Sequence, residues 1–154
     1  MNPSMAQLHG LSRDKAELYG LPHLGARYVT ASGRYEATAE RCVVCGRRAT
    51  NCHHVVPRSV GMTFQREVPA GRLMLRSPLF ALCGSGTTGC HGAFHSGRLK
   101  ARWVWDSEEA EEAWWSGDIL SRHHAHDPAI FAYGHWEIDD TRAGLTVRRE
   151  ETGR

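Results

Sequence analysis

Four of the five cysteines are spaced so that their thiolates could surround one metal ion: Cys42, Cys45, Cys83 and Cys90. The first pair forms a C-x-x-C-G turn, and a tight knuckle of this kind directs two thiolates at the same ion. The second pair is separated by six residues, and the glycines between them, Gly84, Gly86 and Gly89, allow the loop to double back. An all-cysteine site is closed, so we predict a structural zinc whose binding free energy contributes to folding.

The fifth cysteine, Cys52, is left over from this pattern. We expect a small buried residue there, and the alternative is that Cys52 replaces Cys90 as a ligand. An odd number of cysteines beside paired histidines fits metal binding in a reducing compartment better than disulfides. The turn between Cys83 and Cys90 lacks the Gly-Lys-Ser/Thr ending of a phosphate-binding P-loop, so we assign no nucleotide to it.

Four histidines accompany the cysteines: His53, His54, His91 and His95. The first two are neighbours on an expected strand, so their side chains point to opposite sides, and one is expected to bind metal while the other transfers protons. The last two are one helical turn apart and share a face. Together they can complete a three-imidazole site that leaves positions open for water and a phosphate oxygen. The alternative is that all four are structural.

The elements that must position these ligands follow from local pattern. We expect a strand over residues 53–56 that Pro57 ends, and a second strand over 79–82 that leads into Cys83. Residues 59–78 are interpreted as a long connection, and residues 90–99 as a short helix that carries His91 and His95.

The flanking segments carry weaker patterns. We expect a helix near residues 5–19 and a hairpin over 27–35 with its turn at Ser32-Gly33. Toward the C-terminus we predict three further elements: a strand over 102–105, a helix that begins at Asp106 or Ser107 with Asp106 and Glu109 as a capping box, and a hairpin formed by 131–138 and 145–149. All five tryptophans fall in this part, where we expect core or docking roles.

Charge is strongly segregated along the 154-residue chain, which has a net charge of +2. Residues 41–102 hold ten basic side chains and one acid, whereas residues 103–154 hold five basic and twelve acidic ones. A basic block that coincides with the cysteines and histidines suits a polyanion, and we expect Arg58, Arg98 and Lys100 to contact phosphates. The alternative is a solvated basic surface.

Length and hydropathy favour one domain over residues 1–154, because domains most often hold about 100 to 150 residues. No apolar run comes near the roughly 18 residues that a membrane span needs, and the N-terminus lacks the order of a secretory signal. We therefore expect a cytoplasmic protein without a membrane partner.

Taken together, the motifs resemble those of the HNH (His-Me finger) endonucleases. The order is C-V-V-C-G, then H-H-V-V-P-R, then L-C…G-C-H-G-A-F-H, and the G-S-G-T-T-G-C-H-G stretch is similar to HNH proteins of phages and prophages of actinobacteria. The resemblance covers about residues 41–100. It implies an α+β fold with a ββα-metal core and a zinc knuckle, to which residues 101–154 add an acidic, Trp-rich extension with a helix and a hairpin.

The resemblance also implies roles. His53, His91 and His95 would be ligands of one catalytic divalent ion, Mg²⁺, Mn²⁺, Ni²⁺ or Zn²⁺, and His54 would be the general base that activates the attacking water. The implied activity is hydrolysis of phosphodiester bonds in double-stranded DNA, linked to phage genome packaging or defence in the cytoplasm of a bacterial host. Phage packaging proteins are then possible partners of the Trp-rich extension.

One position departs from the family pattern. The family's middle Asn precedes the L-C of the second strand, but Ser77, Pro78 and Leu79 stand there, and the chain has no Asn after Asn51. Gln65, Ser77 or a backbone group could replace its side chain, which helps to hold the loop that carries the base. The rival function is therefore a zinc-stabilised DNA-binding or assembly protein with a degenerate site.

A last histidine group has no counterpart in the family: His123, His124 and His126, followed by Asp127. We interpret it as an exposed helix end rather than a second metal site.

Overall fold

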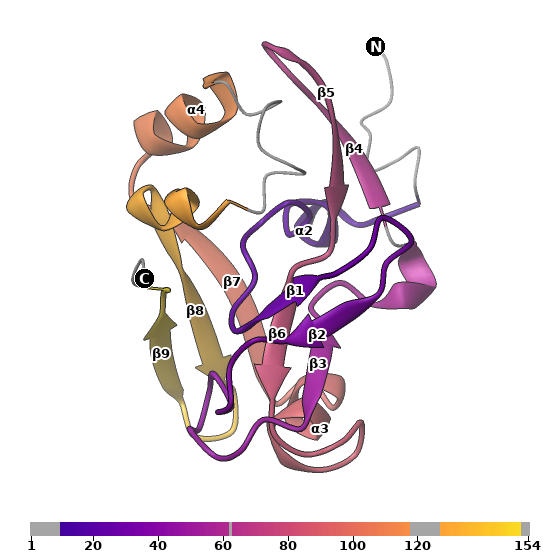
Figure 1. Cartoon of the computed structure of the whole chain (residues 1–154). Helices are drawn as coiled ribbons and strands as arrows, with labels where there is room; N and C mark the ends of the chain where they lie inside the picture. The colour runs from indigo at the N-terminus through magenta and orange to yellow at the C-terminus, as the bar shows by residue number, and fades with distance from the viewer. Residues whose placement is uncertain (1–9, 62, 118–126, 152–154) are drawn as a thin grey trace.

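The computed structural model describes residues 10–61, 63–117 and 127–151 as a mixed α+β structure with small antiparallel sheets (Figure 1). In chain order its elements are α2 (Arg13–Ala16), β1 (Ala26–Tyr28), β2 (Tyr35–Ala37), β3 (Asn51–His54), the 3₁₀ helix η1 (Arg58–Val60), β4 (Thr63–Val68), β5 (Gly71–Arg76), β6 (Leu79–Leu82), α3 (Gly89–His95), β7 (Leu99–Trp105), α4 (Glu108–Ser116), the 3₁₀ helix η4 (Pro128–Ala132), β8 (Gly134–Asp140) and β9 (Leu145–Arg149). None of the described helices is long and apolar enough to cross a bilayer.

Strands β3 and β6 form an antiparallel pair, and β3 carries His53 and His54. His53 lies opposite Phe80 and His54 opposite Leu79. All four residues of β6 are 0% exposed, as expected for a short apolar strand in the centre of the core. The strand predicted over 79–82 is confirmed, whereas β3 begins at Asn51 and ends at His54, earlier than the predicted end at residue 56.

The N-terminal part packs against this pair. The predicted hairpin is confirmed, because β1 and β2 pair with Tyr28 opposite Tyr35. Leu24 bridges to Phe80 of β6, so the segment before β1 is tied to the same strand. Of the helix expected near residues 5–19, the described part contains only α2, and residues 1–9 lie outside the described residues.

The prediction of a long connection without strands over residues 59–78 is corrected by the structure, because β4 and β5 form a regular hairpin there. Its inner face carries the buried side chains Phe64, Leu73 and Leu75. Gln65 and Met74, which lie between these positions and opposite each other, are on the other face, so the segment has the period-2 alternation of a strand pair. In Figure 1 the hairpin extends away from the end of the molecule where α3 lies.

The predicted strand, helix and hairpin of the C-terminal part are confirmed as β7, α4 and the pair β8–β9, although β8 begins at Gly134 and not at residue 131. The sequence did not predict that β7 pairs with β8, which makes a three-stranded sheet in the order β7–β8–β9. The capping box of Asp106 and Glu109 is wrong, because Ser107 caps α4 by accepting a hydrogen bond from the Ala110 N–H. Trp114, Trp115 and Trp136 are buried, which confirms their core role.

Trp136 joins the C-terminal sheet to β6, the strand that pairs with β3. Its ring lies 4.9 Å from that of Phe80 in an edge-on arrangement. Its indole N–H donates to the Pro22 carbonyl at 2.9 Å, so the polar atom of a fully buried ring is satisfied. The core of the molecule is therefore continuous from β8 through β6 to the N-terminal segment.

Candidate functional site

The four predicted cysteine ligands meet at one point. The Sγ atoms of Cys42, Cys45, Cys83 and Cys90 all lie within 4.8 Å of one another, and the Cys45–Cys83 pair is 3.5 Å apart. A tetrahedral zinc with bonds of about 2.3 Å needs sulfur–sulfur separations of about 3.8 Å. The cluster therefore fits a structural zinc ion.

Backbone geometry on both sides of the cluster explains why these four thiols converge. Gly46 follows Cys45 with φ +79°, a conformation that favours glycine, and its N–H returns to the Cys42 carbonyl at 3.0 Å. In the second loop a Cβ on Gly84 would lie 2.1 Å from the Thr88 carbonyl oxygen. Glycine at that position is what lets the loop double back, as predicted.

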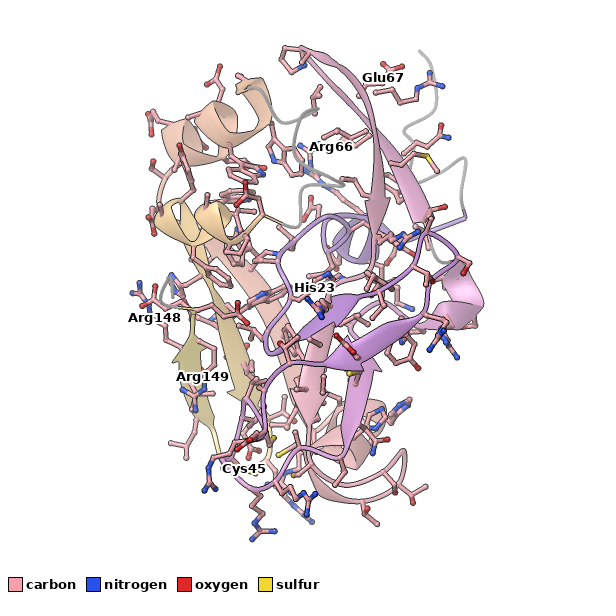
Figure 2. All side chains as sticks on the ribbon, viewed as in Figure 1. His23, Cys45, Arg66, Glu67, Arg148 and Arg149 are labelled. Carbon is pink, nitrogen blue, oxygen red and sulfur yellow. The ribbon has the colours of Figure 1, made fainter. Side chains whose placement is uncertain are left out.

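The knuckle is also held from the C-terminal sheet. Arg149 of β9 donates to the carbonyl of Val43 at 2.6 Å and to that of Val44 at 3.0 Å. Figure 2 shows Arg149 close to Cys45 at one end of the molecule, with Glu67 of the β4–β5 hairpin at the other. The C-terminal extension thus contributes a contact to the cysteine site.

The pKa shifts of the thiols are consistent with a cation bound among them. Burial raises the pKa of Cys90, and the neighbouring Cys42 raises it further. Burial would raise the pKa of Cys42 as well, but backbone hydrogen bonds from Cys45, Cys83 and Val44 lower it to about 7. Four thiols this close cannot all ionise without a positive charge among them, and a bound metal supplies that charge.

Cys52 does not belong to the cluster. It lies on β3 opposite Ala81, is partly buried, and burial raises its pKa. The alternative in which it replaces Cys90 is therefore wrong, because the Cys90 thiol already completes the set.

Three histidines form a second cluster next to the first. The nearest ring nitrogens of His53, His91 and His95 lie within 4.8 Å of one another, and the Nε2 atoms of His91 and His95 are 3.1 Å apart. Imidazole nitrogens that share an ion at bonds of about 2.0–2.1 Å lie about 3.0–3.4 Å apart. The triad could hold a metal, and three ligands leave further coordination positions open.

His53 is the anchored member of the triad. Its side chain stacks on Phe94 of α3 with ring centroids 5.0 Å apart, and it is only 9% exposed. Burial, followed by the charges of His91 and His95, lowers its pKa to about 3. The ring is therefore neutral at physiological pH, and a neutral imidazole is the form that ligates metal.

His54 faces away from the triad, as expected for adjacent residues of a strand. Its ring contacts Tyr35 of β2 edge-on at 4.7 Å between centroids. Burial lowers its pKa to about 4, with smaller contributions from the charges of Arg58 and His91. Its Nε2 atom is buried, and no hydrogen-bond partner is found among the described residues.

Ser77, one of the groups predicted to replace the missing Asn, holds the segment that follows His54. Its hydroxyl is buried, accepts the Val56 N–H at 2.9 Å and donates to the Pro78 carbonyl at 3.1 Å. The Pro78 carbonyl in turn accepts the Val55 N–H at 3.1 Å. Three groups were predicted to replace the Asn side chain: Gln65, Ser77 or a backbone group. Ser77 and the backbone carbonyl of Pro78 hold the segment after His54, whereas Gln65 lies on β4.

His23 was not singled out by its sequence, because it stands alone between Pro22 and Leu24. Its Nδ1 accepts the Leu79 N–H of β6 at 2.9 Å. Burial, together with the charges of His54 and Arg76, lowers its pKa to about 3, which keeps Nδ1 available as an acceptor. Figure 2 shows His23 beside β1. Only the fold reveals that it supports the strand opposite His54.

The three predicted phosphate-binding residues differ in their surroundings. Arg58, in η1, lies over the Tyr35 ring at 5.3 Å, close to His54, and no acidic partner is found in the described ranges. Lys100 is exposed on β7. Arg98 pairs with Asp140 at 3.1 Å, so the acidic extension already neutralises part of the basic block.

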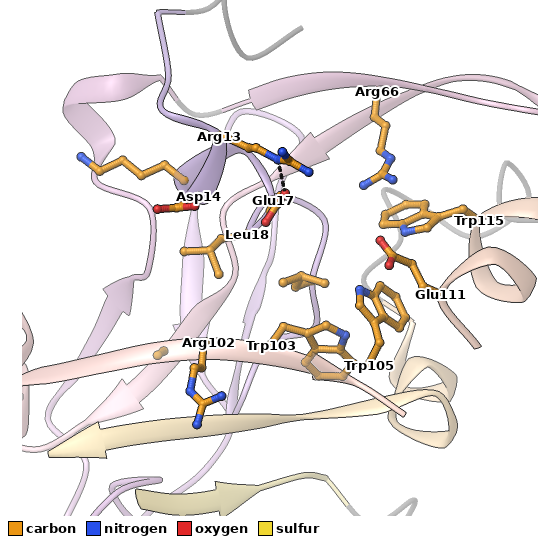
Figure 3. A pocket seen from close by; sticks show the side chains of 13 residues that line it. Arg13, Asp14, Glu17, Leu18, Arg66, Arg102, Trp103, Trp105, Glu111 and Trp115 are labelled. Atoms are coloured by element: carbon orange, nitrogen blue, oxygen red, sulfur yellow. Dashed lines mark hydrogen bonds and ion pairs between the residues drawn. The ribbon is translucent and has the colours of Figure 1, made fainter. Parts of the chain in front are cut away.

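A further cavity of about 470 Å³ lies between α2, β7 and α4, away from both clusters. Arg66 reaches into it from β4 and lies 4.1 Å from the Trp115 ring centroid, with Trp103 and Trp105 nearby (Figure 3). Burial lowers the pKa of Arg66. This arginine therefore supports packing, and it is not presented to a polyanion at the histidines.

The histidine group His123, His124 and His126 lies outside the described residues. Asp127, which follows it, caps η4 by accepting the Ala129 N–H at 2.8 Å.

Comparison of the chain with protein-family models, with curated proteins and with solved structures finds no match. Its function is therefore inferred from the chemistry of the two clusters.

Proposed function

We propose that this chain is a metal-dependent DNA endonuclease of the HNH type, in which β3, β6 and α3 form the ββα-metal core. One observation carries the proposal: three imidazoles converge from β3 and α3, and His54 follows the first of them on the other side of the strand. A purely structural site is usually closed by four protein ligands, whereas a catalytic site keeps positions open.

The proposed roles follow from where the side chains lie. His53, His91 and His95 would hold a divalent ion such as Mg²⁺, Mn²⁺, Ni²⁺ or Zn²⁺, which when bound polarises the phosphate and stabilises the leaving oxygen. His54 would take the proton from the attacking water, because its lowered pKa leaves the ring neutral at physiological pH. Ser77 would keep His54 in place through the Val56 N–H.

DNA is the substrate that the charges support best. The residues of the core carry the basic block, and Arg58 lies beside His54 without an acidic partner in the described part of the chain. A guanidinium there suits a phosphate next to the scissile bond. The exposed Lys100 adds a second contact.

A second candidate is a zinc-stabilised DNA-binding or assembly protein whose histidine site does not cut. The observation that favours it is the burial of His54 Nε2 without a hydrogen-bond partner among the described residues. If Nε2 is the nitrogen that has to take the proton, its burial would leave a site that binds DNA but does not cleave it.

Plasmid cleavage distinguishes the two. We expect the zinc-loaded protein to nick or linearise supercoiled DNA with Mg²⁺, Mn²⁺ or Ni²⁺, and to lose this activity in EDTA until metal is restored. His54→Ala should slow cleavage by about 100- to 10,000-fold, the usual contribution of a general base. DNA binding in a gel-shift assay without cleavage in any of the metals would favour the second candidate.

A further inference from the structure

The Asn51 side chain contacts a histidine of one candidate metal site and the backbone next to a cysteine of the other. It is the first residue of β3, and its Oδ1 lies 3.2 Å from Nδ1 of His91. Its Nδ2 donates to the Gly84 carbonyl at 2.7 Å and to the Thr50 hydroxyl at 3.1 Å. Gly84 directly follows the zinc-site residue Cys83, so the amide joins the cysteine loop to the histidine triad.

The hydrogen bonds fix which way each group faces. The Gly84 carbonyl can only accept, so the NH₂ group of Asn51 must face it and Oδ1 must face His91. Because Oδ1 can also only accept, Nδ1 of His91 must carry the ring proton. Nε2 of His91 is then left with its lone pair, and it is this atom that lies 3.1 Å from Nε2 of His95.

We propose that Asn51 is a positioning residue of the histidine site, which holds His91 in the tautomer that ligates metal and couples that site to the cysteine loop through Gly84. The inference rests on the proposed function only in that the triad binds a divalent ion. Metal-bound histidines generally donate their second N–H to such a partner, and loss of the partner typically costs about 10- to 100-fold in metal affinity.

The chain offers a matched control. The Thr50 hydroxyl donates to the same Gly84 carbonyl at 2.6 Å but has no contact with His91 among its hydrogen bonds. Thr50→Val therefore removes a tether of the cysteine loop and keeps the acceptor for His91. Asn51→Ala removes both its hydrogen bond to the Gly84 carbonyl and the acceptor for His91. Asn51→Asp keeps an acceptor for His91 but loses the donor to Gly84.

The test is to measure Ni²⁺ binding to the zinc-loaded full chain by calorimetry, without DNA. We expect Asn51→Ala to weaken Ni²⁺ binding by about 10- to 100-fold, Asn51→Asp to stay closer to the parent, and Thr50→Val to bind like the parent. Long-range ¹H–¹⁵N NMR of the nickel-free parent should show His91 protonated on Nδ1, and Asn51→Ala should lose this preference.

Parent-like affinity in Asn51→Ala, or an equal loss in Thr50→Val, would overturn the inference and leave the proposed function standing. If Asn51→Ala fails to retain zinc, the parent's NMR spectrum decides, because a proton on Nε2 of His91 contradicts the assignment. A parent that binds no Ni²⁺ beyond its zinc would overturn the proposed function and this inference together.

Discussion

At the scale of single residues, the buried hydroxyl of Ser77 is the group best placed to hold the segment after His54. It is 1% exposed and bonds to Val56 from a position 21 residues away in the chain. A buried N–H that loses its acceptor costs about 1–3 kcal/mol, because water cannot replace the lost bond. Ser77 therefore supports both the stability of β3 and the placement of the proposed base.

We predict that Ser77→Ala lowers the free energy of unfolding by about 1–3 kcal/mol at fixed zinc concentration, measured by urea denaturation. The matched control is Thr146→Ala, which removes an exposed hydroxyl hydrogen bond to Asp139. This control should change stability by less than about 0.5 kcal/mol. Equal effects of the two substitutions would show that the Ser77 bond does not stabilise the fold.

Residues of the site were predictable where their spacing is local. The knuckle pair Cys42 and Cys45 and the helix pair His91 and His95 each follow from a short interval in the sequence. Ser77 was one of three alternatives for its role, and His23 and Asn51 were not assigned, because these roles depend on contacts between distant segments. Polar residues of this kind carry no periodicity, and only strand register brings them to their partners.

At the scale of elements, helix α3 links the two candidate centres. Cys90 belongs to the thiol cluster and His91 to the triad, and the His91 N–H donates to the Cys83 carbonyl at 3.1 Å. The helix is only seven residues long and has no buried residue of its own. Such a short helix is marginal without support, so a zinc ion at its start would hold the histidines in place.

We predict that one tightly held zinc per chain remains after purification, and that a strong chelator unfolds the core, because a site of this kind is coupled to folding. Metal analysis and circular dichroism before and after chelation measure both effects. Cys42→Ser should lose the zinc, whereas Cys52→Ser, on β3 but outside the cluster, should retain it. A chain that stays folded and cooperative without zinc would contradict the prediction.

Elements were predictable where one pattern dominates. The apolar run Leu79–Leu82 and the hairpin of β8 and β9 follow from hydrophobicity and turn residues. The hairpin of β4 and β5 was missed because Arg66 occupies an inward position that usually takes an apolar residue. Its cation–π contact with Trp115 explains how that position accepts an arginine, and this contact cannot be foreseen without the fold.

At the scale of the whole molecule, the acidic extension is folded against the basic block. Arg102 pairs with Glu137 at 2.7 Å and with Asp139 at 3.0 Å, and Arg98 pairs with Asp140. These arginines are partly neutralised before any polyanion binds. Fewer unpaired basic side chains therefore lie near the histidines than the charge count predicts, and Arg58 has no acidic partner in the described part of the chain.

We predict that DNA affinity falls steeply as salt rises, because bound phosphates release counterions. Arg58→Ala should reduce the slope of log affinity against log salt by about one, the share of one phosphate contact. Arg102→Ala should leave the slope nearly unchanged, because its charge is already paired. Fluorescence anisotropy with a labelled duplex measures the affinity of the parent and of both variants. A slope for Arg58→Ala equal to that of the parent would contradict the assignment of Arg58 as a phosphate contact.

The central claim is that the histidine triad holds the metal that supports DNA cleavage, and the most direct test measures both properties in the same preparation. The zinc-loaded parent and His91→Ala are titrated with Ni²⁺ and then assayed on supercoiled plasmid, with Ser96→Ala at the end of the same helix as control. We expect the parent and Ser96→Ala to bind one Ni²⁺ beyond zinc and to cleave, and His91→Ala to lose both while keeping its zinc. Cleavage by His91→Ala at the parent rate, or a parent that binds Ni²⁺ and never cleaves, would contradict the account.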